Sequence, residues 1–187
     1  VGGGWAGCAA AIRARKQGHR VVLLEKTDLL LGLGNVGGIM RNNGRFTAAE
    51  ENISMGSGEL FQITDRLSTH RNVDFPGHKH ASFYDTAMVE PEVRRLLCSL
   101  GIEFKMMTRA IAVRLEKTGP DKRRILRSVL AVAPDKNRAA GLDVLCHIEI
   151  EGDAFVEPTG STGPMGHCVR HGNGCPLCIL SSPTFGH

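Results

Sequence analysis

The stretch Val1-Gly2-Gly3-Gly4-Trp5-Ala6-Gly7 begins the pattern that decides the fold. A run of small residues follows at positions 8–14, and an apolar run at positions 21–24 then ends in Glu25. A glycine-rich turn, a helix with a small-residue face and a hydrophobic strand that ends in an acid are typical of the dinucleotide-binding fingerprint. The sequence therefore predicts an α/β fold in which a parallel sheet binds a nucleotide.

The spacing of the glycines and the acid has a chemical reason. Gly2 permits a tight turn, Gly4 leaves room for a pyrophosphate against the backbone, and Gly7 lets the following helix pack closely on the sheet. The first N–H groups of that helix point at the phosphates. Glu25 lies at the distance at which an acid accepts the ribose hydroxyls of an adenosine.

Length and composition exclude several other classes of protein. The chain has 187 residues, long enough for one domain with a good core, and it contains no apolar run of the roughly eighteen residues that a membrane helix needs. Residues 109–138 hold nine Lys or Arg but no interleaved aromatic residues, which favours a solvated hairpin over a nucleic-acid surface. No secretory leader precedes the fingerprint, so we expect a cytoplasmic protein. The strand that should precede the glycines is missing, so we also expect a partial chain.

The remainder of the chain predicts a single nucleotide-binding domain over residues 1–160. Residues 50–67 and 88–100 have helical spacing. An antiparallel meander is expected over about residues 103–151, with its strands at residues 102–106, 110–115, 125–132 and 144–150. An apolar strand that ends in Thr159-Gly160 then returns to the sheet. Residues 161–187, rich in Gly, Cys and His, form an irregular tail or the start of a second domain.

This order of parts resembles FAD-dependent oxidoreductases with the Rossmann-like FAD/NAD(P)-binding fold of glutathione reductase. It is more distantly similar to the glucose-inhibited division protein A flavoproteins. The resemblance implies FAD as cofactor and a set of residues that hold it. It implies that the pyrophosphate binds at Gly2, Gly4, Trp5, Ala6 and Gly7 and that Glu25 and Lys26 lie at the ribose. It also implies that the backbone of Ala110 or Ile111 meets the edge of the adenine. The rest of the cofactor would meet Gly37, Gly38, Arg45, Thr159 and Gly160.

Proton transfer would fall to the polar segment at residues 78–84. His78 and His80 are the candidate proton donors, because histidine titrates near neutral pH. An exposed polar loop explains the same residues equally simply. Both interpretations stay open at this point.

The tail carries a Cys175-x-x-Cys178 pair. Two thiols at this spacing can close a disulfide, so they are candidates for a redox dithiol that exchanges electrons with the flavin. Ligation of zinc or of an iron–sulfur cluster together with Cys168 is an alternative, and so are reduced cysteines without a role. All three interpretations stay open at this point. Cys175 and Cys178 are kept as candidate catalytic residues, and no metal site is predicted.

These features together predict an FAD-dependent oxidoreductase, or its FAD-binding portion, that transfers a hydride or electrons through the flavin. The expected partners are FAD and a small-molecule substrate or electron donor, with no membrane or nucleic acid; a homo-oligomer is left open. A truncated nucleotide-binding fragment without catalysis is one alternative. An NAD-dependent oxidoreductase on the same fingerprint is the other.

Overall fold

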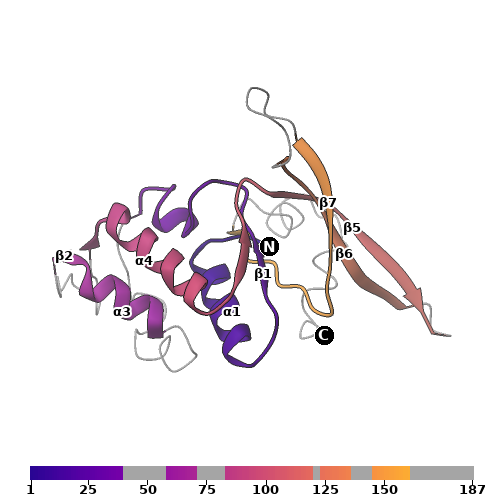
Figure 1. Cartoon of the computed structure of the whole chain (residues 1–187), viewed down its shortest axis with the longest axis horizontal. Coiled ribbons are helices and arrows are strands. Elements are labelled where there is room, and N and C mark those ends of the chain that lie inside the picture. Colours follow the sequence, from indigo (N-terminus) through magenta and orange to yellow (C-terminus); the bar gives the residue numbers. More distant parts are fainter. Residues whose placement is uncertain (40–57, 71–82, 120–122, 136–144, 161–187) are drawn as a thin grey trace. The chain divides into compact units, whose positions relative to one another are not determined.

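The computed structural model describes residues 1–39, 58–70, 83–119, 123–135 and 145–160 (Figure 1). Its elements are α1 (Trp5–Lys16), β1 (Val22–Leu24), the 3-10 helix η1 (Gly32–Gly34), α3 (Gly58–Arg66), β2 (Ser68–His70), β3 (Phe83–Tyr84), α4 (Thr86–Ser99), β4 (Glu103–Lys105), β5 (Arg109–Thr118), β6 (Arg123–Pro134) and β7 (Leu145–Glu151). The chain divides into two compact units. The helical unit comprises Gly4–Leu23 and Leu29–Glu103, and the sheet unit comprises Val1–Gly3, Leu24–Asp28 and the described part of Phe104–His187.

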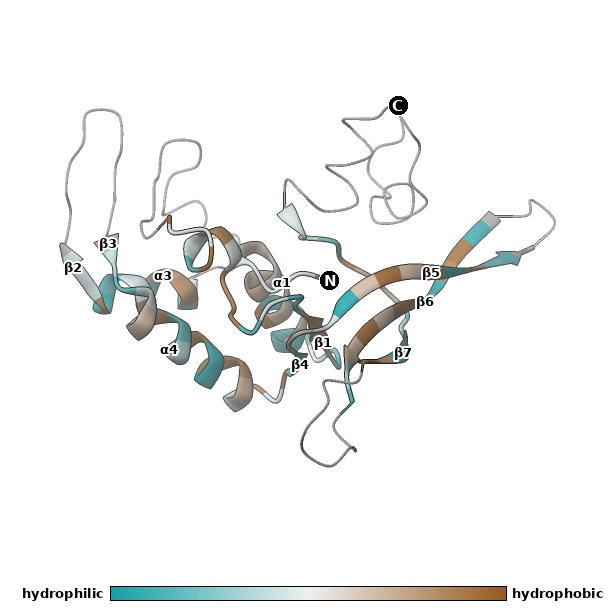
Figure 2. Cartoon of the chain, turned by 90° about the horizontal axis from the view of Figure 1, so that it is seen from above, coloured by the Kyte–Doolittle hydropathy of each residue, from teal (hydrophilic) through white to brown (hydrophobic). Residues whose placement is uncertain are grey.

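The helical unit has its core between apolar helix faces. α4 buries Val89, Val93 and Leu97, which recur every four residues and therefore share one face. α1 contributes Cys8 and Ile12, both almost fully buried. Figure 2 shows how apolar and polar residues alternate along α4. The helix predicted from the amphipathic pattern at residues 88–100 is therefore confirmed as α4.

The ends of α4 are fixed by side chains. Asp85 is the N-cap, and its carboxylate accepts a hydrogen bond from the backbone N–H of Ala87 at 2.8 Å. At the other end, Arg15 Nε of α1 donates to the carbonyl of Leu100 at 2.7 Å. An arginine at this position satisfies a carbonyl that has no partner within the helix. Each contact satisfies a backbone group at one end of α4, and Gly101, with a φ of +67°, follows the C-cap Leu100.

β1 and β4 form a two-stranded sheet. Glu103 donates its N–H to Val21, and Glu25 donates its N–H to Lys105, so residue numbers rise together along both strands and the pair is parallel. The parallel sheet predicted from the fingerprint is confirmed. The expected assignment of residues 102–106 to the antiparallel meander is wrong, because β4 pairs with β1.

The meander itself consists of β5, β6 and β7 in that order, antiparallel throughout. Its strands run from Arg109 to Glu151 and bury Val129, Ala131 and Ala133 of the central β6. Residues 152–160 follow without a regular strand, contrary to the expectation of an apolar strand there. A run that contains Gly152 and Pro158 forms ladder hydrogen bonds poorly, which explains the difference.

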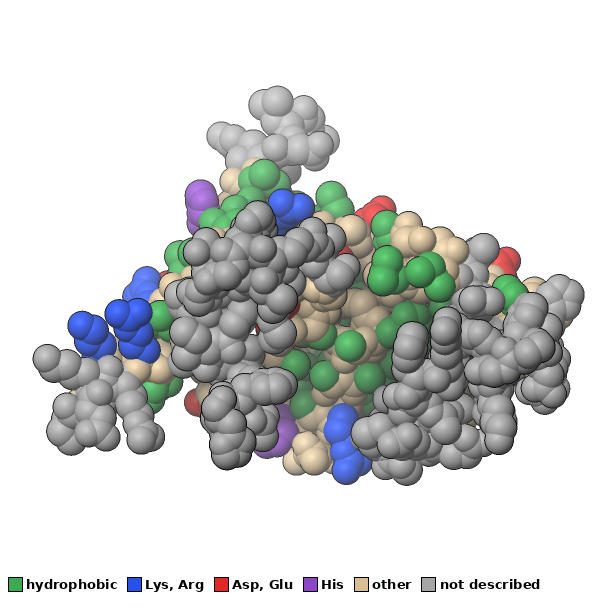
Figure 3. All heavy atoms as spheres, turned by 180° about the vertical axis from the view of Figure 1, so that it is seen from behind, with side chains coloured by type: hydrophobic (Ala, Val, Ile, Leu, Met, Phe, Trp, Pro, Cys, Tyr) green, Lys and Arg blue, Asp and Glu red, His purple; other side chains and the backbone are tan. Residues whose placement is uncertain are grey.

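The basic residues of the meander are exposed. Arg114, Lys117, Arg124 and Arg127 all lie at the surface of β5 and β6. Lys and Arg side chains gather at the free end of this hairpin, at the left of Figure 3. Arg114 pairs with Glu149 across the sheet, at 3.0 Å, and Arg127 pairs with Glu116. These are the charges of a solvated hairpin, as the sequence suggested.

Candidate functional site

Gly2 lies in a tight backbone contact within the sheet unit. Its φ is +112°, and a Cβ at this position would come within 2.9 Å of the carbonyl oxygen of Pro158 and 3.0 Å of the Cα of Thr159. Its N–H donates to the carbonyl of Leu24 at 2.7 Å. Both the positive φ and the close approach require glycine. The residue thus joins the fingerprint to the segment that carries Thr159.

Glu25 follows β1 as a buried carboxylate with 6% exposure. Its Oε2 accepts the N–H of Gly3 at 2.7 Å, and its Oε1 accepts the N–H and the hydroxyl of Thr27 at 2.8 and 2.9 Å. Its backbone is fixed by hydrogen bonds with Lys105 and Thr108. A carboxylate has about four acceptor positions, and donors of the described residues fill three of them.

The N-terminus of α1 belongs to the helical unit and begins at the N-cap Gly4. No side chain among the described residues caps it, and its first turn contains no acid. A Cβ added to Gly4 would meet nothing within 4 Å in the described structure. The first N–H groups of a helix lack intrahelical partners and favour an anion. This arrangement fits a pyrophosphate, as the spacing predicted.

The loop at residues 29–39 follows in the same unit and contacts Gly4. Leu31 forms a parallel bridge with Gly4, and a Cβ on Gly32 would lie 3.3 Å from the Cα of Gly4. Leu31 has a φ of +74° and Gly32 a φ of +52°, so the turn is left-handed at two successive residues. Leu31 is the non-glycine residue that bears this strain, and its side chain is completely buried.

Trp5 and Tyr84 hold the middle of this loop. Their rings meet edge to face with centroids 5.8 Å apart, and the Tyr84 hydroxyl donates to the carbonyl of Gly34 at 3.1 Å. A Cβ on Gly34 would come within 2.6 Å of Trp5 Cδ1 and 2.8 Å of the Tyr84 oxygen. Burial raises the pKa of Tyr84 above its ordinary value, which favours the protonated hydroxyl that donates this hydrogen bond.

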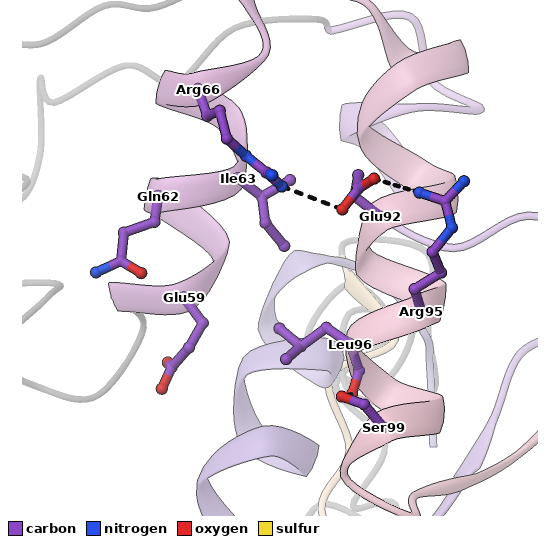
Figure 4. A pocket seen from close by; sticks show the side chains of 8 residues that line it. All are labelled: Glu59, Gln62, Ile63, Arg66, Glu92, Arg95, Leu96 and Ser99. Atoms are coloured by element: carbon purple, nitrogen blue, oxygen red, sulfur yellow. Dashed lines mark hydrogen bonds and ion pairs between the residues drawn. The ribbon is translucent and has the colours of Figure 1, made fainter.

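A shallow groove of about 490 Å³ lies between α3 and α4 (Figure 4). Glu92 pairs there with Arg66, at 3.1 Å, and with Arg95, so the cationic side chains at its rim are neutralised. None of the predicted site residues lines it. We therefore assign the groove no ligand.

Ile111 lies at a β-bulge. The register passes from Ala110 opposite Ala131 to Ala112 opposite Leu130, which leaves Ile111 out of the ladder, and its side chain is 52% exposed. A bulge leaves the extra residue unpaired. This suits the predicted backbone contact of Ile111 with the adenine, which stays a prediction.

The remaining predicted residues are placed individually. Ala6 and Lys26 are exposed, and Gly7 is buried. Gly38 and Gly160 have φ of +71° and +78°, and a Cβ on Gly37 would meet Leu33 at 2.7 Å. Thr159 donates its N–H to Glu157 at 2.9 Å. The predicted site residues that lie outside the described ranges are Arg45, His78, His80, Cys175 and Cys178.

Sequence reasoning missed four residues of this region. Gly3 and Thr27 hold the Glu25 carboxylate, Gly34 accepts the Tyr84 hydroxyl, and the buried Glu90 accepts the N–H of Leu30 at 3.1 Å. Thr27, two residues after the acid, is the only one with a local signal, because short hydroxyl side chains often bond nearby groups. The other three depend on tertiary contacts that no spacing reveals.

The described residues contain no group of three or more His, Cys, Asp or Glu side chains placed to hold a metal ion. None of the helices in the described ranges is both long and apolar enough to cross a bilayer. Neither finding extends to the tail with its cysteines.

Comparison with known proteins identifies the family. The sequence model of the FAD dependent oxidoreductase family matches residues 1–157. The chain belongs to the FAD-dependent oxidoreductase family. FAD is therefore its cofactor, and both the resemblance and the cofactor predicted from the sequence are confirmed.

A solved structure supports the same fold. The crystal structure of Thermovibrio ammonificans THI4 is similar with a TM-score of 0.56 and 14% identity, over 92% of this chain and 60% of that one. The chain thus spans three fifths of the length of this neighbour in fold. At this identity the likeness shows the α/β architecture alone. A search of curated proteins found no match.

Proposed function

We propose that this FAD-dependent oxidoreductase family member transfers a hydride or electrons between FAD and a small-molecule substrate or electron donor. The observation that carries the proposal is the buried Glu25 carboxylate, which Gly3 and Thr27 hold in place; the described residues fill three of its about four acceptor positions. Bound FAD supplies the redox centre, and the protein supplies binding and orientation.

Glu25 accepts the hydroxyls of the adenosine ribose in this proposal. Its two oxygens are already oriented by three donors, so little conformational entropy is lost when the ligand binds. Lys26, beside it and exposed, flanks the ribose. A fixed carboxylate at this point also disfavours a 2′-phosphate by charge repulsion.

In this proposal the pyrophosphate lies at the N-terminus of α1, next to Gly4, Trp5, Ala6 and Gly7. The open space at Gly4 and the uncapped helix end support this assignment. Because no acid occurs in the first turn, no side-chain charge there opposes the phosphates.

The rest of the cofactor is assigned by resemblance. We propose that Gly37 and Gly38 approach the ribityl chain or the ring, that Arg45 offers a polar contact, and that Ile111 meets the adenine through its backbone. Thr159 and Gly160 return the chain to the cofactor. The positive φ of Gly38 and Gly160 and the bulge at Ile111 support these roles.

Proton and electron transfer are assigned to residues outside the described ranges. We propose His78 or His80 as proton donor and the Cys175 and Cys178 pair as a redox partner of the flavin. The dithiol closes to a disulfide when it gives two electrons to the flavin, and the disulfide opens to the dithiol when the reduced flavin returns them. We also propose a cytoplasmic location, with which it agrees that Cys98 and Cys146 form no disulfide among the described residues.

The test is spectroscopic. The purified chain is mixed with FAD, and unbound FAD is then removed. We expect the chain to retain a flavin absorbance band and to reduce a dye when a reductant is supplied. A chain that holds FAD without any turnover would contradict the catalytic proposal and favour a binding fragment. A folded chain that gains no flavin absorbance would contradict the proposal as a whole.

A further inference from the structure

The loop at residues 29–39 is held by two buried polar side chains from one short part of the chain. Tyr84 ends β3, and Glu90 lies in the second turn of α4, six residues later. Tyr84 is 3% exposed and Glu90 is 5% exposed. Burying a hydroxyl and a carboxylate is costly unless each makes hydrogen bonds, so their partners indicate what these groups are for.

Tyr84 holds the far end of the loop. Its hydroxyl donates to the carbonyl of Gly34 at 3.1 Å and lies 3.4 Å from that of Ile39, so it reaches two carbonyl groups of one turn. Its ring meets Trp5 edge to face. The loop turn and the residue after the N-cap of α1 are thereby tied to the same side chain.

Glu90 holds the beginning of the loop. Its Oε1 accepts the N–H of Leu30 at 3.1 Å and also pairs with Arg94. Leu30 is fully buried, and its carbonyl accepts the side-chain amide of Asn35 at 3.2 Å. Hydrogen bonds from the two side chains thus reach the loop at residues 30, 34 and 39.

The position of this loop bears on ligand binding because it touches the helix end assigned to the pyrophosphate. The bridge between Gly4 and Leu31 and the close approach of Gly32 to Gly4 place the loop directly against the N-cap of α1. Side chains that determine where the loop lies also determine how closely a ligand at that helix end can be covered.

We propose that Tyr84 and Glu90 are positioning residues that set the affinity for FAD by holding the loop at residues 29–39 against the N-terminus of α1. The inference rests on the proposed function. In the proposed function Gly37 and Gly38 of this loop approach the ribityl chain or the ring of FAD. Displacing the loop should therefore weaken FAD binding more than binding of ADP, which lacks that part.

The test compares dissociation constants for FAD and ADP, measured by calorimetry on the whole chain. Tyr84→Phe removes only the hydroxyl, and we expect about fivefold weaker binding of FAD with the ADP constant changed less than about twofold. Thr64→Val is the matched control, because Thr64 is also fully buried in the same unit and bonds a carbonyl of its own helix. The control variant should bind both ligands as the wild type does.

A second pair of variants lies on α4. Glu90→Leu removes the acceptor for Leu30, so we expect FAD binding to weaken about fivefold to tenfold, whereas Glu90→Gln keeps an acceptor oxygen and should recover most of the affinity. Glu92→Leu, two residues away on the same helix and partly exposed, is the control and should bind FAD normally.

Trp5 offers an independent readout as the single tryptophan of the chain. Tyr84→Phe should shift its emission, and Thr64→Val should not. Unchanged FAD affinity in Tyr84→Phe and Glu90→Leu, or equal losses for FAD and ADP, would overturn the inference while the proposed function stands. A wild-type chain that binds neither ligand would overturn the proposed function and the inference together.

Discussion

The acids near the fingerprint and the acids of the meander have opposite environments. Glu25 and Glu90 are 6% and 5% exposed and accept backbone N–H groups, and Glu90 in addition pairs with Arg94. The side chains of Glu116 and Glu149 are 54% and 34% exposed and have arginines on the strands of the meander as ion-pair partners. An exposed ion pair is screened by water and contributes little, whereas a buried carboxylate orients every group that donates to it. The comparison teaches that the charge of an acid does not by itself indicate a binding site in this chain. Burial of the carboxylate together with hydrogen bonds from backbone N–H groups is the better indication.

Gly2 and Gly119 also have contrasting surroundings, one crowded and one open. Gly2 has positive φ and is packed against Pro158, whereas Gly119, with a φ of +72° at the end of β5, has open space around its missing Cβ. Gly2→Ala should therefore cost about 3 kcal/mol or more, and Gly119→Ala only about 1 kcal/mol from backbone strain. Urea unfolding of both variants checks this. Equal losses would show that the contact with Pro158 can relax.

The second prediction concerns Glu25 itself. Glu25→Gln turns one acceptor oxygen into an amide that faces a donor, either Gly3 or Thr27, so we expect a loss of about 1–3 kcal/mol in stability and about tenfold in FAD affinity. Glu116→Gln is the matched control in the meander and should change neither quantity measurably. A Glu25→Gln variant that binds FAD as the wild type does would remove the ribose assignment.

The third prediction uses the pKa of Tyr84. Burial raises this pKa in the folded state above the unfolded value near 10, so the neutral phenol stabilises the fold fully below that pH. That contribution is lost as the pH rises through the folded pKa. As the pH rises above 9, the free energy of unfolding, measured with denaturant, should fall more steeply for the wild type than for Tyr84→Phe. Parallel pH profiles would contradict the buried hydrogen bond with Gly34.

The smallest effect is expected in the meander. Arg114 pairs with Glu149 at 3.0 Å, but its side chain is 63% exposed. Arg114→Gln should change the free energy of unfolding by less than about 0.5 kcal/mol, and by less still at high salt. A larger loss, measured by urea unfolding, would mean that the network through Glu149 to the buried Ser128 carries more stability than its exposure suggests.

Local patterns in the sequence predicted those elements whose formation depends on neighbouring residues alone. The glycine spacing predicted the α1 turn, the four-residue spacing of Val89, Val93 and Leu97 predicted α4, and the apolar run before Glu25 predicted β1. Each depends on the period of one element or on the conformation of one residue. These predictions needed no knowledge of what packs against what.

The failures have the opposite origin. Residues 103–105 alternate like a meander strand, but their pairing with β1 is decided by a partner some eighty residues earlier in the chain. Residues 152–160 are apolar in part, yet Val156 and Pro158 contact Val1 and Gly2 without forming a ladder. The role of Tyr84 likewise depends on Gly34, fifty residues away, so no local signal could reveal it.

The central claim is that the fingerprint of this chain selects FAD. Titration of the purified chain with FAD and, separately, with NADH in a calorimeter tests it most directly. We predict saturable binding of one FAD per chain and at least about tenfold weaker binding of NADH. Binding of NADH as tight as that of FAD, or no heat with FAD from a chain that circular dichroism shows to be folded, would contradict the claim.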